Sequence, residues 1–216
     1  MPYAPDLNRL LTAGAKYTDE TREYVIEPHR AGDVVFPTGQ VVGCDPLTSA
    51  GLAHPFTVSV PAGTYPLRLW VAVLYRDGTE EARRAAALQL VIDDAQAARW
   101  DMALVAGQDP AGLDEDSYFG YDVDAGVGTL ADRAALDALA GWDSDRVAEA
   151  YIPAEHVPAP VPGGILTAVT DDATGANVTV ISSGWGDGAY PTFIGYTAAG
   201  AVCAFVTDFR VVPSER

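Results

Sequence analysis

Residues 65–92 read YPLRLWVAVLYRDGTEEARRAAALQLVI, two largely apolar runs separated by the polar segment RDGTEE. Asp77-Gly78 is a typical two-residue hairpin turn, because a type I′ turn needs positive φ at both central residues. Ala85-Ala86-Ala87 also has helical propensity, but the turn favours a strand from Arg84 to Ile92. This stretch therefore predicts a long antiparallel hairpin, which indicates a β-rich fold.

Further strand signals lie on both sides of this hairpin. Short apolar or alternating runs bounded by turn residues are typical of strands. The expected strands are REYVIEP, which stops at Pro28, and residues 41–44, 56–60, 100–105, 165–170, 177–182, 190–196 and 201–206. A turn-rich segment is expected between Pro28 and Gln40.

Three helices are expected. Asp6 is placed as the N-cap of a short amphipathic helix that contains Leu7, Leu10 and Leu11. Thr129 or Asp132 is expected to cap a second helix that stops at Gly141, and Asp143 or Ser144 a third that runs through Ala150. Residues 153–164 contain four prolines and are expected to be a linker.

These signals predict an α+β fold that is predominantly antiparallel β, with two strand groups arranged like a sandwich, a helical insertion and a short N-terminal helix. The length of 216 residues favours one domain. Its expected parts are an N-terminal helical arm (1–20), a first β group (21–106), an acidic loop with the helical insertion and proline-rich linker (107–164), and a C-terminal β meander (165–216).

The chain is strongly acidic, with a formal net charge of −17. Such a charge disfavours binding to nucleic acid or to anionic membrane surfaces, and favours a basic partner or divalent cations. No apolar leader follows Met1, so we expect a cytoplasmic protein. Cys44 and Cys203 lie in or beside apolar runs and are expected to be small buried hydrophobes. The excess of arginine over lysine, with much alanine, indicates a bacterial source.

Two glycine- and aspartate-rich segments are the most unusual features of the sequence. The first is GYDVDAG (120–126), and the second is SGWGDGAY (183–190). GWGDG lacks the lysine and hydroxyl of a phosphate-binding loop, and its aspartate would repel phosphate. Asp122 to Gly126 begins like an EF-hand loop, but Arg133 stands where the bidentate glutamate belongs.

Aromatic and acidic side chains on such loops are typical of a ligand pocket, and also of the edge of a core. The expected ligand-binding residues are Tyr121, Asp124, Trp185, Asp187 and Tyr190. An oxygen-ligand site for Ca²⁺ or Mg²⁺ is a second possibility, because several aspartates follow strands or lie in glycine turns. Its expected ligands are Asp45, Asp124, Asp187 and Asp208.

Nucleophilic catalysis has weaker support. Cys44 with His54 or His156 resembles a thiol–imidazole pair only in residue type, and Ser182 and Ser183 have no nucleophile-elbow sequence around them.

Several segments together resemble a family of uncharacterised bacterial proteins catalogued as domain of unknown function 4241. They are GQVVGCDPL (39–47), FTVSVPAGTYPLRLWVAV (56–73), WDMALVAGQD (100–109), GYDVDAGVGTLAD (120–132) and SGWGDGAYPTFIGYTAAGAVCAFVTDF (183–209). The resemblance covers about Gln40 to Phe209 and implies no reaction. It implies that the family's pattern includes Asp45, Gly120, Asp124, Gly126, Asp132, Ser183, Gly184, Trp185, Gly186, Asp187, Gly188, Tyr190 and Asp208.

Three functions remain open from the sequence, and enzymatic activity stays undecided among them. The leading hypothesis is a protein that binds a small ligand or a protein partner through the two glycine–aspartate loops. The alternatives are a hydrolase assisted by a divalent metal on the aspartate cluster, and an acidic inhibitory or immunity-type protein that binds a basic partner.

Overall fold

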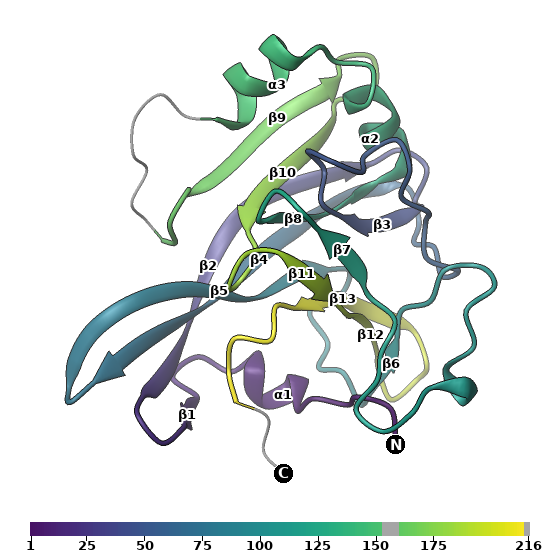
Figure 1. Cartoon of the computed structure of the whole chain (residues 1–216). Coiled ribbons are helices and arrows are strands. Elements are labelled where there is room, and N and C mark those ends of the chain that lie inside the picture. Colours follow the sequence, from purple (N-terminus) through teal and green to yellow (C-terminus); the bar gives the residue numbers. More distant parts are fainter. Residues whose placement is uncertain (153–159, 214–216) are drawn as a thin grey trace.

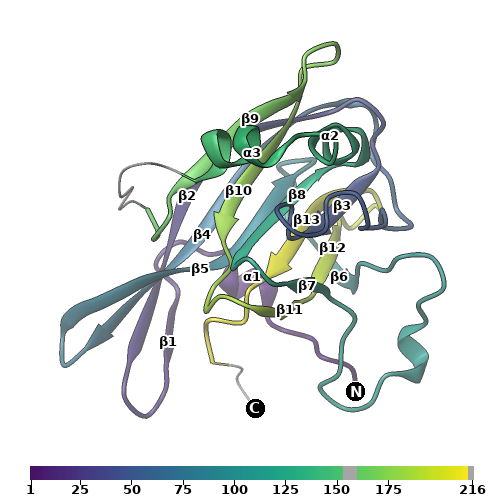
Figure 2. The same cartoon turned by 45° about the horizontal axis from the view of Figure 1, so that its top comes forward.

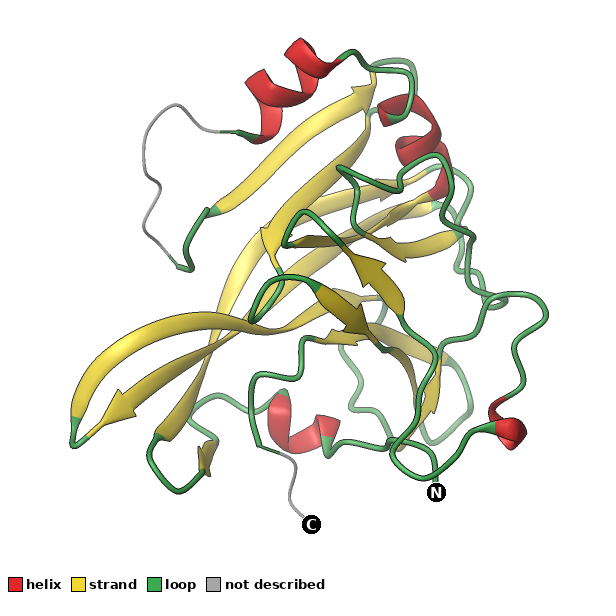
Figure 3. Cartoon of the chain, in the orientation of Figure 1, coloured by secondary structure: helices red, strands yellow, loops and turns green. Residues whose placement is uncertain are grey.

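The computed structural model describes residues 1–152 and 160–213. Strands account for 45% of the chain and helices for 11%, so the fold is α+β and mostly antiparallel β, as the sequence predicted. The strands form two larger sheets and one two-stranded ribbon, and short helices lie at the periphery (Figures 1 and 3). Within the described ranges, none of the helices has the length and apolar character needed to cross a bilayer.

The larger sheet has seven strands, all paired antiparallel. In spatial order they are β1 (Lys16–Thr18), β2 (Glu23–Phe36), β4 (Gly63–Arg76), β5 (Thr79–Val91), β13 (Val202–Asp208), β12 (Thr192–Tyr196) and β6 (Arg99–Met102). The last two strands of the chain thus lie between β5 and β6. The expected separation into a first β group and a C-terminal meander is therefore wrong for strand pairing.

The predicted hairpin forms and organises this sheet. Asp77 and Gly78 have φ of +49° and +76°, as the turn requires. The hairpin of β4 and β5 extends well beyond β13, which pairs only with residues 87–91 of β5, whereas β2 accompanies β4 up to Tyr75 (Figure 1). Ala85, Ala86 and Ala87 are fully buried in β5, so packing overrides their helical propensity.

Strand β2 does not stop at Pro28, which corrects the expected proline stop and turn-rich segment. Pro28 lies opposite Trp70 of β4, and the pairing continues to Phe36. Proline is tolerated at a strand edge because its missing N–H then costs no ladder hydrogen bond. β1 pairs only with residues 23–25 of β2, so Pro28 lies where that edge is free of β1.

A second, four-stranded sheet lies between the first sheet and two helices (Figure 2). Its strands in order are β3 (Val41–Cys44), β8 (Val127–Asp132), β10 (Ala176–Ser182) and β9 (Ile165–Asp171). Successive side chains point to opposite faces. Leu130 therefore joins the core shared with the first sheet, whereas its neighbour Ala131 packs with helices α2 (Arg133–Leu139) and α3 (Ser144–Tyr151).

Aspartates cap the three helices. Asp6 caps α1 (Leu7–Leu10), Asp132 caps α2 and Asp143 caps α3, each accepting a hydrogen bond from a backbone N–H of the first turn. Thr129, the alternative start of the second helix, lies inside β8 instead. A 3₁₀ turn, η1 (Pro110–Gly112), interrupts the acidic loop. Most of the expected proline-rich linker, residues 153–159, lies outside the described residues.

Residues 56–60 form no strand, contrary to the prediction from the sequence. Their N–H groups bond to separate partners: Phe56 to Val41, Thr57 to Leu104 and Val60 to Gly39. Only an isolated bridge joins Phe56 to Val105. Prolines at positions 55 and 61 bound the segment, so its alternating pattern is too short to build a ladder.

Candidate functional site

The two glycine–aspartate segments lie side by side as a ribbon. β7 (Tyr121–Val123) pairs antiparallel with β11 (Gly188–Tyr190), and Tyr121 lies opposite Tyr190. Gly120 permits this approach, because a Cβ there would lie 2.7 Å from the carbonyl oxygen of Tyr190. Segments separated by about sixty positions in the sequence thus form one local structure (Figure 1).

The GWGDG segment is a turn fixed by its own hydrogen bonds. The Ser183 hydroxyl donates to the Gly186 carbonyl at 2.9 Å, and the Gly186 N–H donates to the Ser183 carbonyl at 2.7 Å. The Tyr190 hydroxyl also donates to the Gly186 carbonyl, at 2.7 Å. Gly184 has φ of +48° and packs directly on the Phe209 backbone. The turn is therefore rigid, because hydrogen bonds within the segment satisfy its polar groups.

Trp185 and Asp187 point away from the interior of this turn. Trp185 is 52% exposed, and the guanidinium of Arg84 lies 5.4 Å from its ring centroid. Asp187 is exposed as well. Neither residue lines the cavity between the loop after β3 and strand β7, which is called the main cavity from here on. Trp185 is therefore neither a core residue nor a pocket wall.

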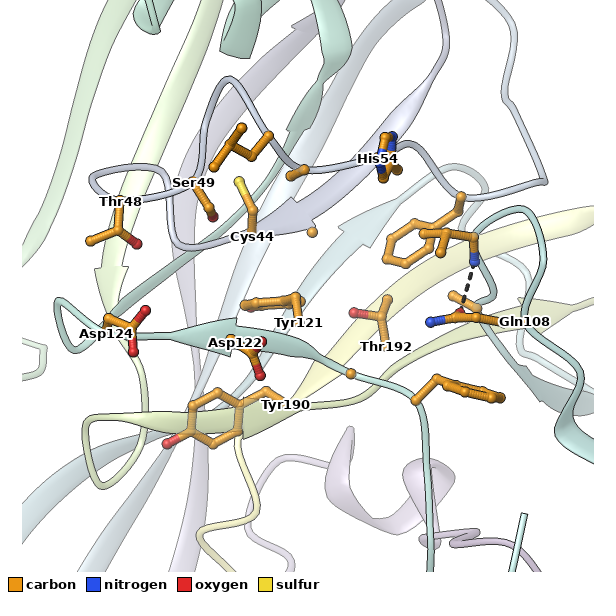
Figure 4. Close-up of a pocket in the computed structure, with 18 residues that line it drawn as sticks. Cys44, Thr48, Ser49, His54, Gln108, Tyr121, Asp122, Asp124, Tyr190 and Thr192 are labelled. Atoms are coloured by element: carbon orange, nitrogen blue, oxygen red, sulfur yellow. Dashed lines mark hydrogen bonds between the residues drawn. The ribbon is translucent and has the colours of Figure 1, made fainter. Parts of the chain in front are cut away.

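The main cavity has a volume of about 450 Å³ and lies between the loop after β3 and the ribbon strand β7 (Figure 4). Tyr121, Asp124 and Tyr190, three of the five expected ligand-binding residues, line it. The remaining polar residues of its lining are Thr48, Ser49, His54, Gln108, Asp122 and Thr192. Apolar walls come from residues such as Cys44, Leu52 and Phe56.

Tyr121 contributes an aromatic ring and not a hydroxyl to this cavity. Its ring lies against Gly43, where a Cβ would come within 3.0 Å of two ring carbons. The Tyr121 hydroxyl is buried beside Gly128 and close to the Thr207 side chain. Burial raises the pKa of this hydroxyl far above its usual value, so it stays protonated.

Asp45 joins the two walls of the cavity. Its carboxylate is fully buried and accepts hydrogen bonds from the N–H groups of Leu47, Asp124 and Ala125, at 3.0, 3.1 and 2.7 Å. The first donor belongs to the loop after β3 and the other two follow β7. Asp45 is therefore a positioning residue that orients Asp124, and it has little capacity left for a ligand.

The expected metal site at Asp45, Asp124, Asp187 and Asp208 does not form. Among residues 1–152 and 160–213, no three acidic, histidine or cysteine side chains gather as a metal would require. Asp45 is committed to backbone N–H groups. Asp208 is buried and accepts from the Tyr3 hydroxyl at 2.8 Å and from the Arg210 N–H, also at 2.8 Å.

Cys44 lines the cavity but is a poor nucleophile. Burial, followed by the neighbouring charge of Asp45, raises the pKa of its thiol to about 12. A thiol with such a pKa is almost entirely protonated at neutral pH, and the thiolate is the reactive form. Cys44 and Cys203 are both buried, as the sequence predicted, and both are free thiols, a state that the sequence left open.

Comparison with known proteins identifies the family. A family model described as "Protein of unknown function (DUF4241)" matches residues 34–207. The chain belongs to this family. Searches of curated proteins and of solved structures gave no match. Membership agrees with the resemblance in the sequence and brings no reaction with it.

The other wall of the cavity was not predicted as a binding surface, and His54 was marked there only as a possible imidazole partner of Cys44. Thr48, Ser49 and His54 lie in the turn-rich loop after β3, which no periodic pattern marks. Gln108 also lines the cavity, and its Oε1 accepts from the Val105 N–H at 3.0 Å. The available signal was the polar and small composition of residues 45–55 beside the family segment GQVVGCDPL.

Proposed function

We propose that this protein binds a small ligand that carries a basic group, in the cavity between the loop after β3 and strand β7. The observation that carries the proposal is a cavity of about 450 Å³ with an apolar floor and polar groups at its margins. Ligand sites usually have volumes of roughly 300–1,000 Å³ and this mixed lining.

The charge of the lining selects a cationic group. Asp122 and Asp124 both line the cavity, and within the described part of the chain neither carboxylate has a hydrogen bond or ion pair. Asp124 contributes only its backbone N–H to the contact with Asp45. The net charge of −17 also concentrates cations near the surface.

The apolar part of the ligand would lie over the rings of Tyr121 and Phe56. Both rings are held by packing, since Tyr121 lies against Gly43 and Phe56 stacks on Phe205 with a centroid distance of 6.0 Å. Leu52 lies at the margin with 78% of its side chain exposed, and burial of this side chain would add to binding. A rigid aromatic floor reduces the entropy lost on binding.

The test is binding of a panel of small aromatic and aliphatic amines, followed by calorimetry and by NMR shifts of residues 44–56 and Tyr121. Asp124→Asn should weaken binding on the order of tenfold, because a charge-assisted hydrogen bond is lost. Asp187→Asn is the matched control, since Asp187 is an exposed aspartate of the same corner that does not line the cavity. The affinity of the Asp187→Asn variant for the amine should stay within about twofold of wild type.

An equal loss in both variants would assign binding to the general surface charge. The absence of binding by every amine would overturn the proposal.

A basic protein partner is a second candidate, favoured by the exposed Trp185 beside Asp187. Exposed tryptophans are enriched at interface hot spots. Trp185→Ala should then abolish capture of the partner and leave binding of the amine unchanged. Retention of the partner by this variant would exclude Trp185 as its anchor.

Bacterial origin and a cytoplasmic location also remain predictions. The two free, buried cysteines support a reducing compartment. Fractionation of the native host is the direct measurement.

A further inference from the structure

A second cavity of about 270 Å³ lies on the face of the seven-stranded sheet that α1 crosses. Arg68 and Trp70 of β4 and Gln89 of β5 line it together with Asn8 of α1 and Thr12. It shares no lining residue with the main cavity. Figure 1 shows α1 below the strands of this sheet, away from the four-stranded sheet.

Arg68 is an unpaired cation in this cavity. Among the described residues its guanidinium has no hydrogen bond or ion pair, and its nearest recorded partner is the Trp70 ring at 5.8 Å. The arginine opposite Arg68 does have an acidic partner. Arg30 of β2 lies opposite Arg68 in the register and forms an ion pair with Asp33 at 2.7 Å. Arg68 is half-buried, so its guanidinium has lost part of its hydration without gaining an acidic partner among the described residues.

A second donor lies next to Arg68. Gln89 is its register partner on β5, and the Oε1 of Gln89 accepts the indole N–H of Trp70 at 2.9 Å. The amide nitrogen of Gln89 is therefore available to donate. A guanidinium beside an amide N–H matches the two oxygens of a carboxylate.

Carboxylates also line this cavity, and among the described residues they form no ion pair. Asp93 and Asp94 line the same cavity from the loop after β5. Asp93 accepts the Ala95 N–H at 2.7 Å, whereas Asp94 has no hydrogen bond or ion pair within the described residues. Arg68 and Asp94 thus carry opposite charges in one cavity without pairing to each other. A phosphate dianion would be repelled by these aspartates, whereas an ammonium group would be attracted.

We infer that this cavity binds a small zwitterion of the α-amino acid type, with its carboxylate on Arg68 and Gln89 and its ammonium group toward Asp94. Trp70 and Trp100 supply flat walls for the side chain. The volume is below the usual range for drug-sized ligands, which fits a molecule of amino-acid size.

The experiment titrates the protein with each of the free amino acids and follows the indole N–H signals by NMR, assigned through single tryptophan-to-phenylalanine variants. Trp70 and Trp100 line the cavity, whereas Trp142 and Trp185 lie elsewhere. At least one amino acid should shift the first two signals and leave the other two unchanged. The N-acetylated form, which lacks the ammonium group, and the amino acid amide, which lacks the carboxylate, should each bind more weakly.

Arg68→Gln should weaken this binding by on the order of tenfold or more, because it removes the charge-assisted contact. Arg30→Gln is the matched control, because it removes the same charge from the opposite position of the sheet without touching this cavity. Thermal melts confirm that each variant is folded. Failure of all amino acids to shift Trp70 and Trp100 would overturn the inference, as would equal losses in the two variants. Binding of inorganic phosphate with the same indole shifts would replace the zwitterion by a simple anion.

Discussion

The aspartates of this chain serve different purposes that depend on their surroundings. Asp45 and Asp132 are fully buried and accept backbone N–H groups, which fixes loops and a helix start. Asp208 is buried with fewer donors. Asp122 and Asp124 are exposed and leave their carboxylates unpaired at the main cavity. Of these three groups, only the last is suited to recognise a ligand in the main cavity.

Asp45→Asn should destabilise the protein by about 2–4 kcal/mol, because buried N–H groups would lose their charged acceptor. The measurement is the free energy of unfolding in urea. Asp122→Asn is the control, since this exposed side chain accepts no recorded hydrogen bond, and it should change stability by less than about 0.5 kcal/mol. A small effect of Asp45→Asn would show that the loop after β3 does not depend on this carboxylate.

Asp208 should give the protein an unusual pH dependence. Burial raises the pKa of Asp208 above its usual value of 3.8. The folded state therefore holds this proton more tightly than the unfolded state does. The stabilisation of the folded state that results is complete below pH 3.8 and is lost as pH rises through the folded-state pKa of Asp208. The stability of wild type relative to Asp208→Asn should consequently increase as pH falls through this window.

Asp19 should give the stability of the protein a pH dependence of the opposite sign. Hydrogen bonds from Tyr24 and from the Thr21 backbone lower its pKa to about 2. The stability of wild type relative to Asp19→Asn should be complete above pH 3.8 and decline as pH falls toward about 2. Urea unfolding at a series of pH values measures both differences. The same sign for both variants would contradict the assigned environments.

At the scale of elements, the β7–β11 ribbon determines the shape of the main cavity. Its two strands come from the segments that the sequence marked as unusual, and Gly120 lets their backbones approach. The neighbouring GWGDG turn holds the ribbon through Tyr190, whose hydroxyl donates to Gly186. The conformational role of the glycines is therefore to build the ribbon and not to cradle a ligand.

Gly120→Ala should destabilise the protein by about 1–3 kcal/mol, because its methyl group would overlap the Tyr190 backbone. Gly112→Ala is the matched control in the same loop, since nothing lies within 4 Å of a Cβ there and neither glycine has a positive φ. Its stability should stay within about 1 kcal/mol of wild type. Hydrogen exchange should show faster opening of β7 and β11 only in Gly120→Ala. Equal exchange in both variants would contradict the close approach.

At the scale of the whole molecule, the net charge of −17 means that acidic side chains repel one another, which destabilises the folded state. Most ion pairs are at the surface, including Lys16–Glu23 and Arg30–Asp33, and contribute little individually. Raising NaCl from about 0.02 to about 0.5 M should therefore increase the melting temperature, because screening removes more repulsion than attraction. Sucrose at matched osmolality is the control for non-ionic effects. A lower melting temperature in salt would show that the ion pairs outweigh the repulsion.

The sequence by itself determined the local structure of this protein. The hairpin at Asp77-Gly78, the cap at Asp6 and strand β3 follow from turn chemistry, capping and apolar patterns, which act over a few residues. The resemblance of several segments indicated the family, and the composition of the two glycine- and aspartate-rich segments pointed to Tyr121, Asp124 and Tyr190, which line the main cavity.

Only the tertiary structure decided how these parts meet. It placed β12 and β13 inside the first sheet, carried β2 through Pro28, and brought the loop after β3 over β7. It also committed Asp45 to backbone donors and left Arg68 without a hydrogen bond or ion pair among residues 1–152 and 160–213. The physical reason is that strand pairing and charge pairing join residues far apart in the chain. Local propensity contains no information about these partners.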